Sequence, residues 1–90
     1  MKNIMEAHQI RMINEYYDLC NKYKKLIKLL RDYDIGQLKF TLNCPVELLK
    51  EQADVMKRYI DILFKRSEYE NIKLDKYDFN IEYGEEYGRY

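Results

Sequence analysis

Residues 48–63 have the sequence LLKEQADVMKRYIDIL, in which apolar side chains recur at helical spacing. They form two neighbouring rows with one member every seven residues: Leu49, Met56 and Leu63 in one row, and Leu48, Val55 and Ile62 in the other. Ala53 and Ile60 widen the stripe. The pattern predicts an amphipathic helix whose broad apolar face needs a second element to bury it.

A longer helix is predicted over residues 4–31. Three adjacent rows of apolar and aromatic residues run along it: Met5, Met12, Leu19 and Leu26; Ile13, Cys20 and Ile27; Tyr16, Tyr23 and Leu30. One partner helix usually covers fewer rows than that. We expect this helix to contact one helix of its own chain and one from another copy. The alternative is a wide stripe buried within the chain and capped by tyrosine hydroxyls.

The second helix is expected to start with Pro45 at its first position and to run to about Tyr69, with Asn71 as the first plausible stop. No Gly or Pro interrupts it. The predicted fold is therefore mainly α: an antiparallel two-helix hairpin, assembled into an oligomeric bundle. Residues 1–70 would form the hairpin domain and residues 71–90 a tyrosine-rich acidic tail.

Two segments outside the helices alternate with a period of two, which is typical of strands. The first, residues 37–42 of the 32–44 connection, follows the turn-forming Asp32, Asp34 and Gly36. The second is the tail segment 77–83. A short strand pair between connection and tail would satisfy both backbones. A helix of about 24 residues separates the two segments by roughly 35 Å. Residues 70–76 span at most about 25 Å, so pairing with a neighbouring subunit is favoured over pairing within the chain.

Composition narrows the function classes. The 90 residues carry 16 Lys and Arg against 16 Asp and Glu, so net charge is zero, which argues against a duplex nucleic-acid binder. Residues 1–31 hold seven basic against three acidic residues, and residues 67–90 hold three against seven. The acidic tail can therefore lie across the basic first helix, or both can be solvated. Two cysteines and one histidine predict neither metal nor cofactor, and reduced thiols in a cytoplasmic protein without membrane spans.

No residue pattern suggests catalysis. His8 fits a surface position, Cys20 lies in an apolar row, and Gly36 stands alone rather than in a phosphate-binding loop. We therefore expect a protein that is not an enzyme. Polar residues that a hairpin would gather at its open end are Arg11, Glu15, Tyr59, Lys65, Arg66 and Tyr69.

Two interpretations of this open end stand. One is an ordinary ion pair of Glu15 with Arg66 under tyrosine rings. The other is a ligand-binding pocket in which Arg11 and Arg66 hold phosphate while Tyr59 and Tyr69 stack on a base.

The helix sequences also resemble those of very small helical-hairpin accessory proteins encoded by tailed bacteriophages, over about residues 10–67. The residues that carry the resemblance are Arg11-Met12-Ile13-Asn14-Glu15, Leu19, Lys24-Lys25-Leu26, Leu48-Leu49-Lys50-Glu51-Gln52, Met56, Tyr59, Ile62-Leu63 and Arg66. The resemblance implies a host-defence antagonist in the cytoplasm of an infected bacterium. By analogy with phage proteins of that type, it would be a homo-oligomer that sequesters a small nucleotide immune signal, such as a cyclic nucleotide. The alternative is a protein–protein interaction module that inhibits or adapts a host or phage protein through its apolar helix face or its tail.

Overall fold

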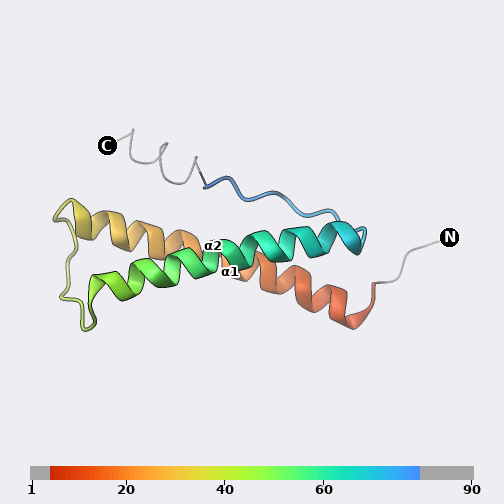
Figure 1. The fold of residues 1–90 in the computed structure, drawn as a ribbon, viewed down its shortest axis with the longest axis horizontal. Coiled ribbons are helices and arrows are strands. Elements are labelled where there is room, and N and C mark those ends of the chain that lie inside the picture. Colours follow the sequence, from red (N-terminus) through yellow and green to blue (C-terminus); the bar gives the residue numbers. More distant parts are fainter. Residues whose placement is uncertain (1–4, 80–90) are drawn as a thin grey trace.

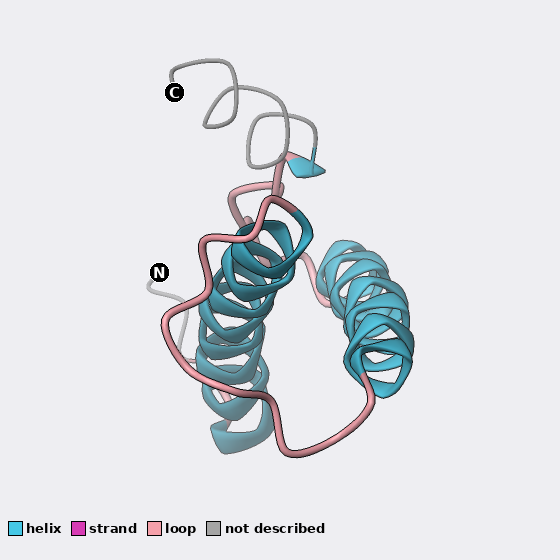
Figure 2. Cartoon of the chain, turned by 90° about the vertical axis from the view of Figure 1, so that its left-hand side faces the viewer, coloured by secondary structure: helices cyan, strands magenta, loops and turns pink. Residues whose placement is uncertain are grey.

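The computed structural model of the chain describes residues 5–79, which form a hairpin of two antiparallel helices. Helix α1 spans Ala7–Asp34 and helix α2 spans Val46–Tyr69. Figure 1 shows the two helices lying alongside each other, and Figure 2 shows the connection crossing between them at one end. The predicted mainly α hairpin is confirmed. Within the described residues, neither helix is both long enough and apolar enough to cross a membrane.

Helix α1 begins and ends about three residues later than its sequence pattern suggests. At its start, the backbone N–H of the N-cap residue Glu6 donates to Oε1 of Gln9 at 2.8 Å. At its end, the N–H of Gly36 donates to the carbonyl of Tyr33 and that of Gln37 to the carbonyl of Asp32. This Schellman arrangement needs a left-handed residue, and Gly36 supplies it with φ of 73°.

Helix α2 ends where the sequence indicates. Pro45 is its N-cap rather than its first residue. Past Tyr69 the same capping arrangement recurs, because the N–H of Asn71 donates to the carbonyl of Glu68 and that of Ile72 to the carbonyl of Ser67. Asn71 adopts φ of 58°, a conformation that asparagine tolerates better than most residues. The chain therefore reverses direction directly after α2.

The core lies between the helices and uses only part of the predicted apolar face of α2. Helix α1 contributes six buried side chains: Met12, Tyr16, Cys20, Tyr23, Ile27 and Leu30. Helix α2 contributes Ala53, Ile60 and Leu63, with Leu49 and Met56 packed against them. The second row of α2 points outward, with Leu48, Val55 and Ile62 exposed by 55, 60 and 50%. One hairpin thus leaves a row of apolar side chains in solvent.

Residues 71–79, which we call the strap, run back along the helix pair from the end of α2, as the light-to-dark blue segment of Figure 1 shows. Ile72 and Leu74 are buried, and Tyr77 and Phe79 pack against the core. The described residues contain no β-strand, so neither 37–42 nor 77–79 forms the predicted strand. The remainder of the segment 77–83 lies outside the described residues.

Tyrosine hydroxyls of α1 bond backbone groups of the strap at Asp75 and Tyr77, where a strand partner was predicted to do so. The Tyr16 hydroxyl donates to the carbonyl of Asp75 at 2.7 Å and accepts from the N–H of Tyr77 at 3.1 Å. The Tyr17 hydroxyl accepts from the N–H of Asp75 at 3.0 Å. The ring of Tyr23 meets those of Tyr77 and Phe79 edge-on, with centroids 5.7 and 5.4 Å apart. Side chains of α1, rather than a neighbouring strand, therefore hold the strap in place.

Candidate ligand-binding site

The four residues predicted to bind a ligand are exposed in one chain and do not line either hollow described below. Arg11 and Arg66 are exposed, Tyr59 is 38% exposed and Tyr69 is 91% exposed. Arg11 directly precedes buried Met12, so it is turned about 100° away from the core-facing row of α1. A small ligand held by all four would need further walls from outside the chain.

The register of the hairpin differs from the one counted from the sequence. Gln9 pairs with Glu70 by a hydrogen bond of 3.0 Å, and the rings of Tyr16 and Phe64 have centroids 6.3 Å apart. Arg66 therefore lies level with residues 13–14 of α1, about three residues from the Ile10 and Arg11 expected opposite it. The long connection is placed asymmetrically, because α1 extends to Asp34 before the chain turns.

Glu70 joins the end of α2 to the start of α1 at the open end of the hairpin. Its carboxylate accepts the hydrogen bond from Gln9, and Nε2 of His8 lies 3.5 Å from the same oxygen. The hydrogen bond from Gln9 lowers the pKa of Glu70 below its usual range, and the charges of His8 and Arg66 add to this effect. Arg66 thus acts on Glu70, a residue that the sequence interpretation did not consider for this pairing.

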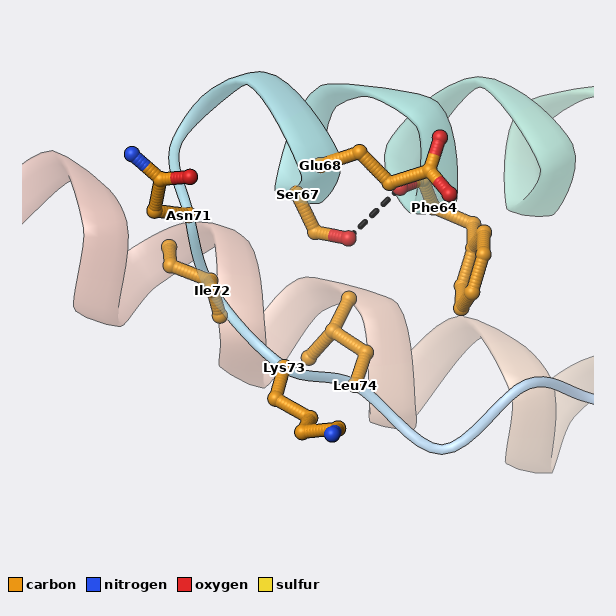
Figure 3. Close-up of a pocket in the computed structure, with 7 residues that line it drawn as sticks. All are labelled: Phe64, Ser67, Glu68, Asn71, Ile72, Lys73 and Leu74. Carbon is orange, nitrogen blue, oxygen red and sulfur yellow. Dashed lines mark hydrogen bonds between the residues drawn. The ribbon is translucent and has the colours of Figure 1, made fainter.

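A hollow of about 380 Å³ lies under the turn from α2 into the strap (Figure 3). Its lining residues are Phe64, Ser67, Glu68, Asn71, Ile72, Lys73 and Leu74. The hydroxyl of Ser67 donates to the carbonyl of Phe64, so the one buried polar side chain here is used within α2. Lys73 is the single cation in this lining, which makes the hollow a poor match for a ligand with several phosphates.

A second hollow, which we call the inter-helix hollow, is better equipped. It measures about 430 Å³ and lies between the helices toward their connected end, where α1 supplies Tyr23, Ile27, Leu30 and Asp34, α2 supplies Lys50, Ala53, Asp54 and Lys57, and the strap supplies Phe79. Its lining therefore combines aliphatic side chains, two aromatic rings, two ammonium groups and two carboxylates. That mixture suits a polar molecule with a flat ring.

The two lysines of the inter-helix hollow are held differently. Nζ of Lys57 lies 5.1 Å from the centroid of the Phe79 ring, a cation–π distance. Nζ of Lys50 lies 4.0 Å from a carboxylate oxygen of Asp34, with both side chains about half exposed. Such an exposed pair contributes little stability, so Lys50 is available to an incoming anion. The seven-residue spacing places both lysines on one side of α2.

Sequence reasoning missed this hollow because its residues come from three segments. Tyr23 was recognised as part of an apolar row and Ala53 as part of the stripe of α2. A small residue between two lysines was the available signal, since Ala53 leaves space that Lys50 and Lys57 border. Only the register of the hairpin and the course of the strap bring Tyr23 and Phe79 to that space.

The nucleophiles and possible metal ligands of the described residues offer little chemistry. Burial raises the pKa of the Cys20 thiol, so that it stays protonated near neutral pH. Burial, followed by the neighbouring Cys20, raises the pKa of Tyr16 to about 12. No three His, Cys, Asp or Glu residues within residues 5–79 are placed to hold a metal ion.

These features define a small two-helix hairpin protein with an extended strap and a polar hollow between its helices. The chain belongs to the Sequestin family, whose family model matches residues 6–69. The match begins at the N-cap of α1 and ends at the last residue of α2, so the strap lies beyond it. The family name is consistent with a sequestering role that needs no catalysis. No curated protein and no solved structure matches the chain.

Proposed function

We propose that this protein is not an enzyme but a sponge, a homo-oligomer that binds a small nucleotide immune signal and withholds it from its receptor. In this proposal it is a bacteriophage antagonist of host defence that acts in the cytoplasm of the infected cell. The observation that carries the proposal is the match of both helices to the Sequestin family. The resemblance of residues 10–67 to phage-encoded helical hairpins supports the same role.

We place the nucleotide in the inter-helix hollow. Its size, about 430 Å³, lies within the range of small-molecule sites. In this arrangement the ammonium groups of Lys50 and Lys57 contact phosphate, the rings of Tyr23 and Phe79 contact the base, and the carboxylate of Asp54 accepts hydrogen bonds from ribose hydroxyls. The aliphatic side chains behind them exclude water, which strengthens each polar contact.

A second possible site, completed by another copy of the chain, stays a prediction; it would use Arg11, Tyr59, Arg66 and Tyr69. Each is exposed, so none is committed to the core of its own chain. Variants in these four residues and in the lining of the inter-helix hollow distinguish the two possible locations of the ligand. Loss of binding in Lys57→Glu places the ligand between the helices, whereas loss in Arg66→Ala with Lys57→Glu unaffected places it on the outer side of α2.

Calorimetry with a panel of cyclic dinucleotides and cyclic ADP-ribose isomers tests the proposal. We expect sub-micromolar binding of at least one compound by the wild-type chain. Lys57→Glu should weaken it on the order of ten- to a hundredfold, because a hydrogen bond to a charged group is lost. Lys22→Glu is the matched control, since Lys22 pairs with Asp18 on the exposed side of α1 and makes the same charge change.

Recovery of the ligand tests the non-enzymatic part. After incubation and heat denaturation, a sponge returns the nucleotide intact and in stoichiometric amount, whereas an enzyme returns a product. Absence of binding across the panel refutes the nucleotide proposal.

A second candidate function is a protein–protein interaction module. The exposed row Leu48, Val55 and Ile62 favours it, since exposed apolar rows commonly mark interaction surfaces. Capture of one defined host or phage protein, lost in Val55→Asp and accompanied by no nucleotide binding, would support it over the first proposal.

A further inference from the structure

Helix α2 carries a second apolar seam that its own hairpin leaves uncovered. We call it the outer seam; it comprises Leu48, Gln52, Val55, Tyr59, Ile62, Arg66 and Tyr69. The members alternate at steps of four and three residues, which is the spacing of a coiled-coil core. Five of the seven are apolar or aromatic, and their side chains are between 38 and 91% exposed.

We propose that two copies of the chain pair through their outer seams, with the two α2 helices antiparallel about a two-fold axis. The inference deepens the homo-oligomer of the proposed function and rests on it only for the existence of an assembly. Two observations beyond the apolar row identify the occupant as a second copy: the coiled-coil spacing and the charges that border the seam.

The two borders of the outer seam differ. On one border stand Leu49, Met56 and Leu63, which pack toward α1 and are already engaged in the core. On the other border stand Glu51, Arg58 and Lys65, all exposed. This charged border is acidic at Glu51 and basic at Arg58 and Lys65, so its two ends are complementary to the opposite ends of a reversed copy.

An antiparallel pair brings the charged borders of the two copies together, since equivalent borders meet in that orientation. With Val55 of one copy packed against Tyr59 of the other, Glu51 lies opposite Lys65 of the second copy, twice by symmetry. Arg58 lies at the axis, opposite Arg58 of the second copy and beside Tyr59 of that copy, on whose ring it can stack. The two Glu51–Lys65 attractions outnumber this one like-charge contact. The antiparallel helix dipoles also attract.

A parallel pair is disfavoured by the same residues. It would place each charged border against the border of Leu49, Met56 and Leu63, so Glu51, Arg58 and Lys65 would have no ionic partner across the seam. Lys65 pairs with Asp61 in the isolated chain at 3.2 Å, with both side chains more than half exposed. That weak surface contact does not prevent Lys65 from reaching a second copy.

Charge exchange tests the orientation, and sedimentation equilibrium measures it. We expect wild-type protein at micromolar concentration to sediment at twice the chain mass of 11.1 kDa. Glu51→Lys and Lys65→Glu should each raise the dissociation constant about tenfold, since each turns two attractions into repulsions. The variant that carries both Glu51→Lys and Lys65→Glu should restore the wild-type dissociation constant. Residues 51 and 65 are about 21 Å apart along α2, so only contact between copies explains a rescue.

Val55→Asp tests the seam itself and should give a folded monomer, because Val55 is 60% exposed in one chain. The matched control is Ile10→Asp, at a 48% exposed position of α1, which should leave the dimer intact. The proposal is overturned if the wild-type protein is still a monomer at about 100 times that micromolar concentration. It is also overturned if Val55→Asp leaves the dissociation constant of the dimer unchanged. A seam-dependent dimer without charge rescue overturns the antiparallel orientation. Calorimetry on the same samples keeps the outcomes separate, since a dimer that binds no nucleotide refutes the proposed function alone.

Discussion

The anchoring of the strap by Tyr16 leads to a quantitative prediction for Tyr16→Phe. This variant keeps the ring and removes one oxygen that makes two hydrogen bonds, to the carbonyl of Asp75 and from the N–H of Tyr77. Tyr16 is 1% exposed, so water does not replace them without rearrangement of the strap. At about 0.5–1.5 kcal/mol for each bond, the loss is about 1–3 kcal/mol.

A loss of that size is a substantial part of the stability of a small domain, which is typically about 5–15 kcal/mol. It corresponds to a fall in melting temperature of roughly 4–8 °C for each kcal/mol. Urea unfolding followed by circular dichroism gives the free energy, and hydrogen exchange at the Tyr77 amide reports on the strap. The exchange of this amide should accelerate while amides in the middle of α1 and α2 change less.

Tyr17→Phe is the matched control for this prediction. It also removes a tyrosine hydroxyl that contacts the strap, but this hydroxyl accepts only the bond from the N–H of Asp75, at an exposed site. Its effect should be below about 1 kcal/mol. If Tyr16→Phe is as stable as wild type and protects the Tyr77 amide equally well, then the hydroxyl does not anchor the strap and the reasoning fails.

Three further predictions concern single groups. Because the pKa of Tyr16 is raised to about 12 in the folded chain, its contribution to stability is complete below pH 10 and is lost between pH 10 and 12; the stability difference between wild type and Tyr16→Phe should shrink across that window. Because the pKa of Glu70 is lowered by the hydrogen bond from Gln9, the stability that this bond provides should be present above pH 4.5 and be lost at lower pH, while the cap that Gln9 makes with Glu6 persists; a Gln9→Met variant with unchanged acid sensitivity would contradict this. Gly36→Ala should lower stability by about 1 kcal/mol in thermal unfolding, although an added Cβ meets nothing within 4 Å, because φ is 73°; an unchanged melting temperature would argue against strain at this turn.

Much of the helical fold follows from the sequence, since periodicity depends on the chain alone. The rows of seven in α1 and α2 place both helices, and Asn71 marks the end of α2. Spacing could not decide which row of α2 faces inward, because Leu49 and Leu48 belong to neighbouring rows of equal apolarity. The packing of α1 decides it, and buries Leu63 while leaving Ile62 in solvent.

The strap and the inter-helix hollow could not be predicted, for a different reason. Alternation over residues 77–83 predicts a strand but not its partner, and hydroxyls of Tyr16 and Tyr17, not a neighbouring strand, bond backbone groups of the strap. The hollow depends on the register between the two helices, and the register counted from the sequence is wrong by about three residues. A shift of that size changes which side chains of α1 stand beside Lys57.

The order of synthesis gives the strap a further consequence. Its hydrogen bonds join residues separated by 58 to 61 positions, so they form only after both helices have left the ribosome. Contacts between distant parts of a chain form late and slowly. Until the strap has emerged, the side chains that it covers on the helix pair, Tyr16 and Tyr23 among them, lack that cover. Nascent chains stalled in this region would therefore be better substrates for chaperones and proteases than finished ones.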